Sequence, residues 1–381
     1  MSHGKFSTPG KVAASVLALG LVSQASAFEF QAGDVNAKVY GYARLNATYD
    51  IDEDISTSRG TRSGDFSKVN TGDAEDSEVS GHFGADAFQS RIGVRATTPE
   101  GVAVTIEGDF RSFSGSPGNL RLRHAYGEYN GVLMGRTWSN FNSFIGLVPN
   151  LEFDPLAGSA GYTNRISQVR YSTGPVSIAL EDTVSRIDGT DAEQDRLPTL
   201  TARYESRSGG SGFAAAALVH QVGYDDSVND DTAVGYAVFG AAKLALTDTL
   251  SVMGSINYTD GANGYLWRSG SNFYGQDAYL NGDSVETIVG YGGTLGASLK
   301  VGPGAITAGV GSVTMDWDDA EDDGLAVGDQ HERNSHAILN YQWSPVKNVK
   351  LGVQYSHYRV KLVNGDDGDA NRLHFAGQYN F

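Results

Sequence analysis

The sequence predicts an all-β fold, a 16-stranded antiparallel transmembrane β-barrel. Three observations lead to it: segments of about ten residues in which apolar and polar side chains alternate, connections that are alternately short and long, and no apolar stretch approaching 18 residues after the N-terminal leader. Alternation with period two is typical of outer-membrane strands, whose apolar side chains face lipid and whose polar side chains face the interior. The composition favours strands too, with 49 glycines, 19 tyrosines and 16 phenylalanines against 9 prolines.

Residues 1–27 have the pattern of a secretory signal peptide, which leaves 28–381 as one barrel. Two lysines precede the apolar run 12–22, and Ala25 and Ala27 form a small-residue cleavage site. Loss of the two lysines takes the net charge from −17 to −19, which argues against a nucleic-acid partner. The chain has no cysteine, so an exported protein of this sequence has neither disulfides nor thiolate chemistry.

Strands are predicted wherever the alternation persists. In one segment Val104 and Ile106 fall on one face, while Thr105 and Glu107 fall on the other. The predicted strands are 37–51, 88–98, 101–112, 120–130, 131–138, 164–173, 175–185, 198–207, 211–224, 232–246, 249–259, 285–301, 304–315, 334–344, 347–362 and 370–381.

The connections between these segments alternate in length. Short turns such as "TPEG", "NG", "TGP" and "VGPG" alternate with long polar loops. Short turns at one rim and long loops at the other are typical of bacterial barrels. A closed sheet pairs every backbone amide and carbonyl in lipid, and about sixteen strands leave a lumen too wide for side chains to fill. The predicted long loops are 52–87, 112–119, 139–163, 186–197, 225–231, 260–284, 316–333 and 363–369.

Several motifs resemble the DcaP-like porins of Gram-negative bacteria. They are "QSRIGVRATTPEG", "VTIEGDF", "LRLRHAYGEYNGVLMGRTWSNF" and "NRISQVRYSTGP", and the resemblance is densest from Gln89 to Pro175. It implies a homotrimeric outer-membrane barrel that favours small anionic solutes, dicarboxylates in particular. Family members often carry a coiled-coil N-terminal extension, whereas about nine residues, 28–36, precede the first strand here. A terminal Phe381 after an alternating strand is the pattern that the outer-membrane assembly machinery reads in porins.

Basic residues crowd the first eight predicted strands, and alternation turns them inward. A guanidinium in lipid costs roughly 2–4 kcal/mol at the midplane, which favours the lumen. Arginines clamp carboxylates with two parallel hydrogen bonds and so select anions; in the other interpretation they only pair with lumenal acids and stiffen the wall. The predicted pore-lining set is Arg44, Arg91, Arg95, Arg121, Arg123, Arg136, Arg165, Arg170 and Arg203, with Glu107 and Asp109.

The long connection 139–163 is too apolar for a loop in free water. We expect it to fold into the barrel and set the constriction, with Glu152 and Asp154 facing the arginine wall; the alternative is burial against a neighbouring subunit. Its aromatic residues are Phe141, Phe144 and Phe153.

The stretch "RLRHAYGEYN" allows two registers. A two-residue turn at Asn130-Gly131 without a bulge puts the arginines and Tyr129 in the lumen with Arg136, and sends His124, Tyr126 and Glu128 outward. A bulge near Arg123-His124 instead turns that second row into the pore as well.

Acid-rich loops suggest a solvated rim that recruits divalent ions bridging lipopolysaccharide. Asp319, Glu321 and Asp323 before Gly324 imitate a calcium loop, but position twelve is Gln330 rather than Glu, so no metal site or cofactor is predicted. Catalytic motifs fail as well: "HERNSH" is not H-E-x-x-H, and no G-x-S-x-G is present. The prediction is therefore a passive anion-preferring porin of the outer membrane rather than an enzyme. The alternatives are a general diffusion porin, a barrel enzyme and an adhesin.

Overall fold

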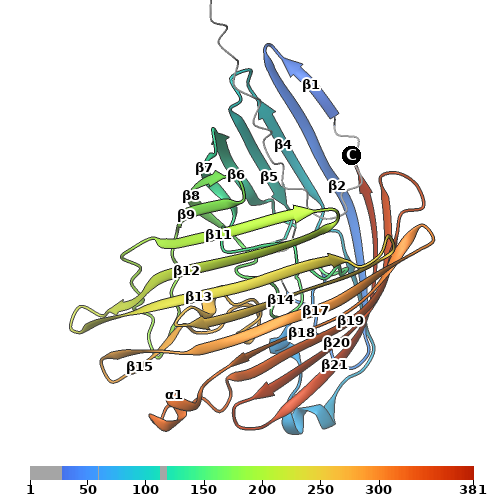
Figure 1. Cartoon of the computed structure of the whole chain (residues 1–381). Helices are drawn as coiled ribbons and strands as arrows, with labels where there is room; N and C mark the ends of the chain where they lie inside the picture. Colours follow the sequence, from blue (N-terminus) through green and yellow to red (C-terminus); the bar gives the residue numbers. More distant parts are fainter. Residues whose placement is uncertain (1–27, 59, 112–117) are drawn as a thin grey trace, which may run out of the picture.

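A computed structural model describes residues 28–58, 60–111 and 118–381, and its main sheet closes into a ring (Figure 1). The ring closes because β2 pairs with β4 on one side and with β21 on the other. With β3 and β4 counted as one interrupted strand, the ring is an antiparallel barrel of sixteen strands, as predicted. The ring strands are β2 (Val35–Asp50), β3 (His82–Asp86), β4 (Arg91–Thr97), β5 (Ala103–Asp109), β6 (Arg121–Tyr129), β7 (Val132–Trp138), β8 (Arg165–Thr173), β9 (Val176–Glu181), β11 (Thr199–Ser208), β12 (Ser211–Asp225), β13 (Asp230–Ala245), β14 (Leu250–Asp260), β17 (Val289–Val301), β18 (Gly304–Met315), β19 (His331–Trp343), β20 (Val349–Leu362) and β21 (Asp367–Asn380). The predicted signal peptide lies outside the described residues.

The predicted strands depart most from the structure at two places. The second strand begins in the segment assigned to a loop, because β3 already pairs with the upper part of β2, as at Tyr49 and Phe83. The predicted strand 285–301 is two strands. The backbone leaves the ring at Ile288, which is buried and donates its N–H to the Asp277 carbonyl at 2.9 Å.

The ring has a short wall and a long wall. Strands β4 to β9, the short wall, have six to nine residues each. Strands β12 to β14 and β17 to β21, the long wall, have 11 to 16. A tilted strand needs about 9–11 residues to cross a membrane, so most short-wall strands fall below that length.

Alternation on the long wall follows the predicted pattern. On β13, Val234 and Val238 are exposed on the outer surface, whereas Ala237 and Phe239 are buried inside. The outer face is therefore apolar on the strands that are long enough to meet lipid.

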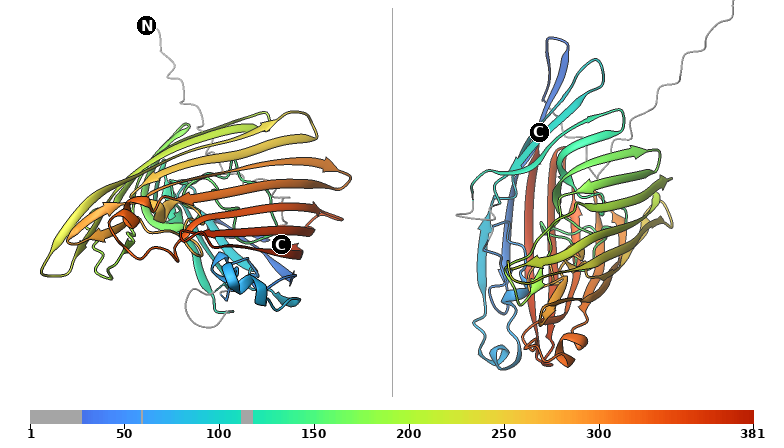
Figure 2. Two further views of the ribbon diagram at one scale, coloured as in Figure 1. Left: turned by 90° about the horizontal axis from the view of Figure 1, so that it is seen from below. Right: turned by 90° about the vertical axis from the view of Figure 1, so that its left-hand side faces the viewer.

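Long connections gather at one rim, opposite the C-terminus, as the further views show (Figure 2). At this rim β10 (Ile187–Asp188), β15 (Ala278–Asn281) and β16 (Ser284–Thr287) form a separate three-stranded sheet. None of the helices in the described ranges has the length and apolar character needed to cross a membrane. At the other rim β1 (Phe28–Ala32) forms a hairpin with β2. The helices are η1 (Phe66–Lys68), η2 (Gly72–Ser77), η3 (Asn263–Tyr265) and α1 (Asp318–Asp322).

Candidate functional site: an arginine-lined cavity in the barrel

The segment between β7 and β8, residues 139–164, crosses to the far side of the ring; we call it the inner loop. Its Gly158 carbonyl accepts hydrogen bonds from Ser255 Oγ at 2.9 Å and from Asn257 Nδ2 at 2.7 Å, both on β14. Farther along the long wall, Asn340 Nδ2 donates to the Pro149 carbonyl at 2.9 Å. Contacts with β14 and β19 from a segment that leaves β7 place the inner loop inside the ring.

Small residues on the long wall let the inner loop lie close to the sheet. A Cβ added at Gly146 would lie 2.1 Å from the Gly254 carbonyl oxygen, and one added at Gly309 would lie 2.5 Å from Val148. Buried Val148 and Leu156 pack in one cluster with Met253 of the wall. The glycines that interrupt the apolar alternation of these strands therefore serve close packing of the loop.

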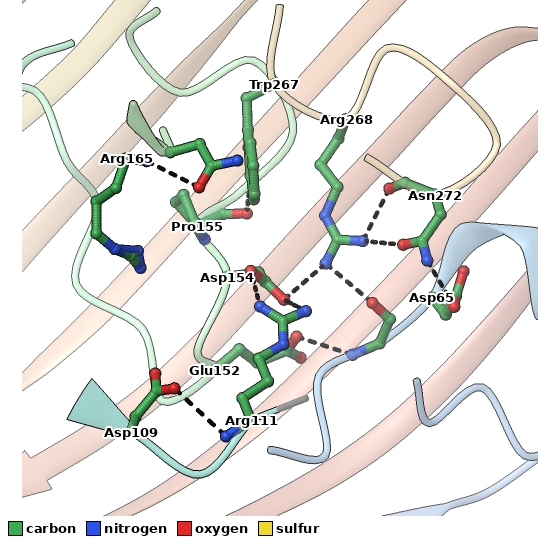
Figure 3. Close-up of polar contacts among 12 residues, drawn as sticks. Asp65, Asp109, Arg111, Glu152, Asp154, Pro155, Arg165, Trp267, Arg268 and Asn272 are labelled. Atoms are coloured by element: carbon green, nitrogen blue, oxygen red, sulfur yellow. Dashed lines mark hydrogen bonds and ion pairs between the residues drawn. The ribbon is translucent and has the colours of Figure 1, made fainter. Parts of the chain in front are cut away.

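The tip of the inner loop turns neighbouring side chains to different sides (Figure 3). Glu152 accepts hydrogen bonds from the Gly64 N–H at 3.1 Å and from the Tyr358 hydroxyl on the long wall. Asp154 instead forms a bidentate pair with Arg111, with both N–O distances 3.2 Å. The expectation that both acids face the arginines of the predicted set is therefore wrong for Glu152, and the arginine that pairs with Asp154, Arg111, lies outside that set.

Aromatic residues of the inner loop divide between packing and cation contacts. Phe141 is fully buried and packs edge-on against Phe239, with ring centroids 5.1 Å apart. Phe144 packs against Trp138 at 5.1 Å. Phe153 lies beneath guanidiniums, with the Arg111 guanidinium carbon 4.6 Å from its ring centroid. Aromatic rings attract cations at such distances, so Phe153 helps to fix the arginines around it.

Several predicted arginines form ion pairs with the predicted acids. Arg121 donates two hydrogen bonds to Asp109, at 2.8 and 2.6 Å, and Arg123 bridges Glu107 at 2.7 Å and Asp109 at 2.8 Å. Arg91 lies 3.3 Å from Glu107. These contacts bring the β4, β5 and β6 residues of the predicted set together on the inward face.

The register of β6 is the bulged one. Glu107 pairs with His124 and the next residue, Gly108, with Leu122, so Arg123 and His124 together oppose one position of β5. Both side chains are buried inside. Farther along, Glu128 forms an ion pair with Arg95 on the inward face. The row His124, Tyr126 and Glu128 therefore faces the lumen.

Arg136 lies beside the bulge on β7. Its pairing partners are Ala125 and Ser167, and it alternates with Thr137, which bonds inward to His124 Nδ1 at 3.0 Å. Its charge nevertheless acts on His124 and Tyr162, which are buried inside the ring. Arg165, on the same face of the β7–β8 pair, also reaches the interior. The unbulged register was therefore wrong for β6, and alternation alone gives no direction to Arg136.

Four predicted arginines lie elsewhere on the inward face. Arg44 donates to the Leu151 carbonyl, and Arg203 to the Asn142 carbonyl, so both hold the inner loop from the ring. Arg170 lies beside buried Leu133. Arg165 is buried at the upper end of β8, with its guanidinium carbon 4.2 Å from the Trp138 ring centroid.

A cavity of about 380 Å³ lies between the inner loop and the short wall. Among the described residues, four arginines line it against a single carboxylate, that of Asp154. Trp267, Phe273 and Tyr274 from the segment after β14 form its opposite side. The charged lining residues are Arg111, Arg121, Arg165, Arg186 and Asp154.

Asp154 is ionised in this setting. Burial alone would raise the pKa of its carboxyl, but Arg111 and Arg268 beside it lower that pKa below its usual value. Arg268 is 1% exposed, lies 3.8 Å from Asp154 and donates to the Gly64 carbonyl at 2.9 Å. The positive charge of the cavity is therefore partly compensated by one buried acid.

Three arginines of this site were missed from the sequence: Arg111, Arg186 and Arg268. Arg186 and Arg268 lie in connections, where alternation gives no direction. Arg111 lies in the predicted strand 101–112, on the face of Glu107 and Asp109, but it was left out of the predicted set; in the structure it follows the end of β5. The acidic segment at α1 carries no site in the described part of the chain, where no group of three or more metal-ligating side chains is arranged to hold an ion. "HERNSH" opens β19, as its pattern indicates.

The fold and the inward set define an outer-membrane porin, and comparison with known proteins agrees. Among solved structures the chain is similar to the outer-membrane channel DcaP of Acinetobacter baumannii, with TM-score 0.79 and 27% identity over 92% of this chain and 99% of that one. An anion-selective porin from Comamonas acidovorans (TM-score 0.57, 13% identity, 91% and 100% covered) and Salmonella typhi OmpF (0.55, 13%, 93% and 100%) share the fold. Among curated protein sequences no relative matches.

The family is DcaP. The model of the DcaP outer membrane protein family matches residues 22–381, and the chain belongs to that family. The predicted resemblance is thereby confirmed, as is the assignment to the outer membrane.

Proposed function

We propose that this porin passes small anions, dicarboxylates in particular, through a constriction between the inner loop and the short wall. The observation that carries the proposal is the cavity whose lining, in the described part of the chain, holds four arginines and one carboxylate. Excess positive charge in a low-dielectric cleft raises the local concentration of anions. Guanidiniums also match the geometry of carboxylates, which favours them over chloride.

The inner loop supports this proposal as the element that narrows the lumen. It is held from several directions, by Arg44 and Arg203 on the ring and by Asn340 on the long wall. A loop held at so many points is suited to a fixed constriction, because it keeps Phe153 and Asp154 opposite the short wall.

The short wall supports the proposal that the porin is a homotrimer. Its strands of six to nine residues are mostly shorter than a membrane-crossing strand, which suits contact with protein better than contact with lipid. We also propose that Phe381 is read by the outer-membrane assembly machinery, that residues 1–27 are cleaved on export, and that the acidic long-loop rim faces lipopolysaccharide.

Reversal potentials across planar bilayers test the anion preference. With a potassium chloride gradient, the purified porin is expected to give a potential of the sign set by chloride, and a larger selectivity for succinate than for acetate. A potential near zero for all salts would indicate a general diffusion porin. A potential of the sign set by potassium would overturn the proposal.

A further inference from the structure

The guanidiniums of the cavity fall into two classes. Arg111 and Arg121 each hold a carboxylate with two hydrogen bonds, to Asp154 and Asp109 respectively. Arg165 and Arg186 line the same cavity, but within the described ranges neither forms a salt bridge. The two classes therefore differ in whether their hydrogen-bond donors are already used.

Arg165 is pre-oriented without a carboxylate. Its side chain is 7% exposed and stacks at 4.2 Å on Trp138, which takes up one face of the guanidinium. Its backbone N–H donates to Asn164 Oδ1 at 2.8 Å, which fixes the main chain at the start of β8. Stacking on an aromatic face leaves the N–H groups at the edge of the guanidinium available to a ligand.

Arg186 is held in a similar way from the loop after β9. Its backbone N–H donates to Asp277 Oδ2 at 2.9 Å, and its carbonyl accepts from the Asp277 N–H at 2.7 Å. The neighbouring pairing of β10 with β15 extends this contact. Asp277 also accepts from the Gly264 N–H at 2.6 Å, so its carboxylate binds backbone amides rather than the guanidinium. That guanidinium lies 5.0 Å from the Tyr274 ring centroid.

We infer that Arg165 and Arg186 bind the permeating anion directly, whereas Arg111 and Arg121 fix the wall around it. An acid-paired arginine must release its protein carboxylate before it can take a solute carboxylate, and that release leaves a buried charge uncompensated. Arg165 and Arg186 can bind the solute without breaking an ion pair with a protein carboxylate. Two such guanidiniums suit a solute with two carboxylates, one for each guanidinium. The inference rests on the proposed anion preference.

The test is the concentration dependence of current in planar bilayers with succinate as the only permeant anion. Arg165→Gln and Arg186→Gln are expected to raise the half-saturating succinate concentration about tenfold each, since a hydrogen bond to a charged group is lost. Arg359→Gln is the matched control, because it removes the same charge from an exposed site on β20 that does not line the cavity. It is expected to stay within about twofold of the wild type.

Folding is checked by the shift in gel mobility on heating, and Arg165→Lys covers the case in which Arg165→Gln does not fold. The lysine keeps the charge but loses the bidentate geometry, so it is expected to fold and to bind succinate more weakly than the wild type. If the cavity variants have the same half-saturating succinate concentration as Arg359→Gln, in an anion-selective and saturable wild type, this inference alone would be overturned. A wild type that favours cations or does not saturate would overturn the proposed function as well.

Discussion

The short wall and the long wall of this barrel both shape the space between them, but with different residue types. The short wall carries charge: Arg121 and Arg123 are buried against Asp109 on strands of seven and nine residues. The long wall carries small residues such as Gly254 and Gly309, against which the inner loop packs. The constriction is therefore bounded by a closely packed loop on the long-wall side and by fixed charges on the short-wall side.

The largest expected effect is on the charged side. Asp154→Asn leaves buried Arg111 and Arg268 without a carboxylate, so we expect a loss of about 3–5 kcal/mol in the free energy of unfolding. The same change removes the carboxylate of the cavity, so anion selectivity should rise. Denaturant titration followed by fluorescence measures the first, and the reversal potential the second. The double variant Arg111→Gln/Asp154→Asn should recover part of the stability; a single variant as stable as the wild type would contradict the role given to this pair.

A second experiment compares the outer faces of the two walls. Val238→Arg on the long wall places a guanidinium in lipid, which should cost about 2–4 kcal/mol near the membrane midplane and reduce insertion. Met134→Arg on the short wall, where the Met134 side chain is exposed, should insert but weaken association between copies. Urea titration in vesicles measures the first, and native gels measure the second. Equal loss of insertion in both variants would mean that the short wall also faces lipid.

Periodicity predicted the ring well because alternation and turn chemistry are local signals. Short turns and polar loops predicted the fifteen connections between the sixteen strands. The bulged register of β6 was one of the two registers that the sequence left open. The direction of His124, Tyr126 and Glu128 stayed open because a single extra residue opposite Glu107 reverses every later side chain of β6. The direction of Glu152 also depends on tertiary contacts, with Tyr358 on a strand more than two hundred residues away.

The cavity was harder to predict than the ring for a related reason. Arg186 and Arg268 lie in connections, where no period assigns a direction to a side chain, whereas Arg111 lay in the predicted strand 101–112 and was left out of the predicted set. Arg268 adopts a φ of 67°, in the left-handed region, which an arginine in a sequence does not predict. The polar neighbours of Arg186, above all Asp277, come from the loop after β14. The sequence therefore indicated an arginine-rich lumen without showing which guanidiniums meet in one cavity.

The small-residue side is tested by adding one methyl group. Gly146→Ala would bring a Cβ to 2.1 Å from the Gly254 carbonyl, so the inner loop must shift, at a cost of about 1–3 kcal/mol. A displaced loop should also raise single-channel conductance. Gly240→Ala on β13 of the long wall is the control, because the added Cβ would lie 3.7 Å from its nearest neighbour, Ile256. Equal conductance in both variants would show that close packing of the loop does not set the constriction.

The smallest expected effect lies at the long-loop rim, in the segment 51–81. Burial, with the nearby Glu78 carboxylate, raises the pKa of Glu53 to about 7, while its Oε1 accepts the Asn70 N–H at 2.9 Å. A raised pKa in the fold means that the protonated form is the stabilising one, so this contribution is complete below the ordinary carboxyl pKa and is lost as the pH rises through 7. We expect hydrogen exchange in this segment, corrected for the intrinsic pH dependence, to be a few-fold faster at pH 8 than at pH 5.

Glu53→Gln should abolish that difference, because the amide stays neutral at every pH. Glu193→Gln, in the loop before β11, is the matched control and should leave the pH dependence of segment 51–81 unchanged. If the Glu53→Gln protein retained the full difference, another group would be responsible for it. If hydrogen exchange in the Glu53→Gln protein does not change between pH 5 and pH 8, titration of this one carboxyl loosens the long-loop rim. That effect would be independent of the charged cavity.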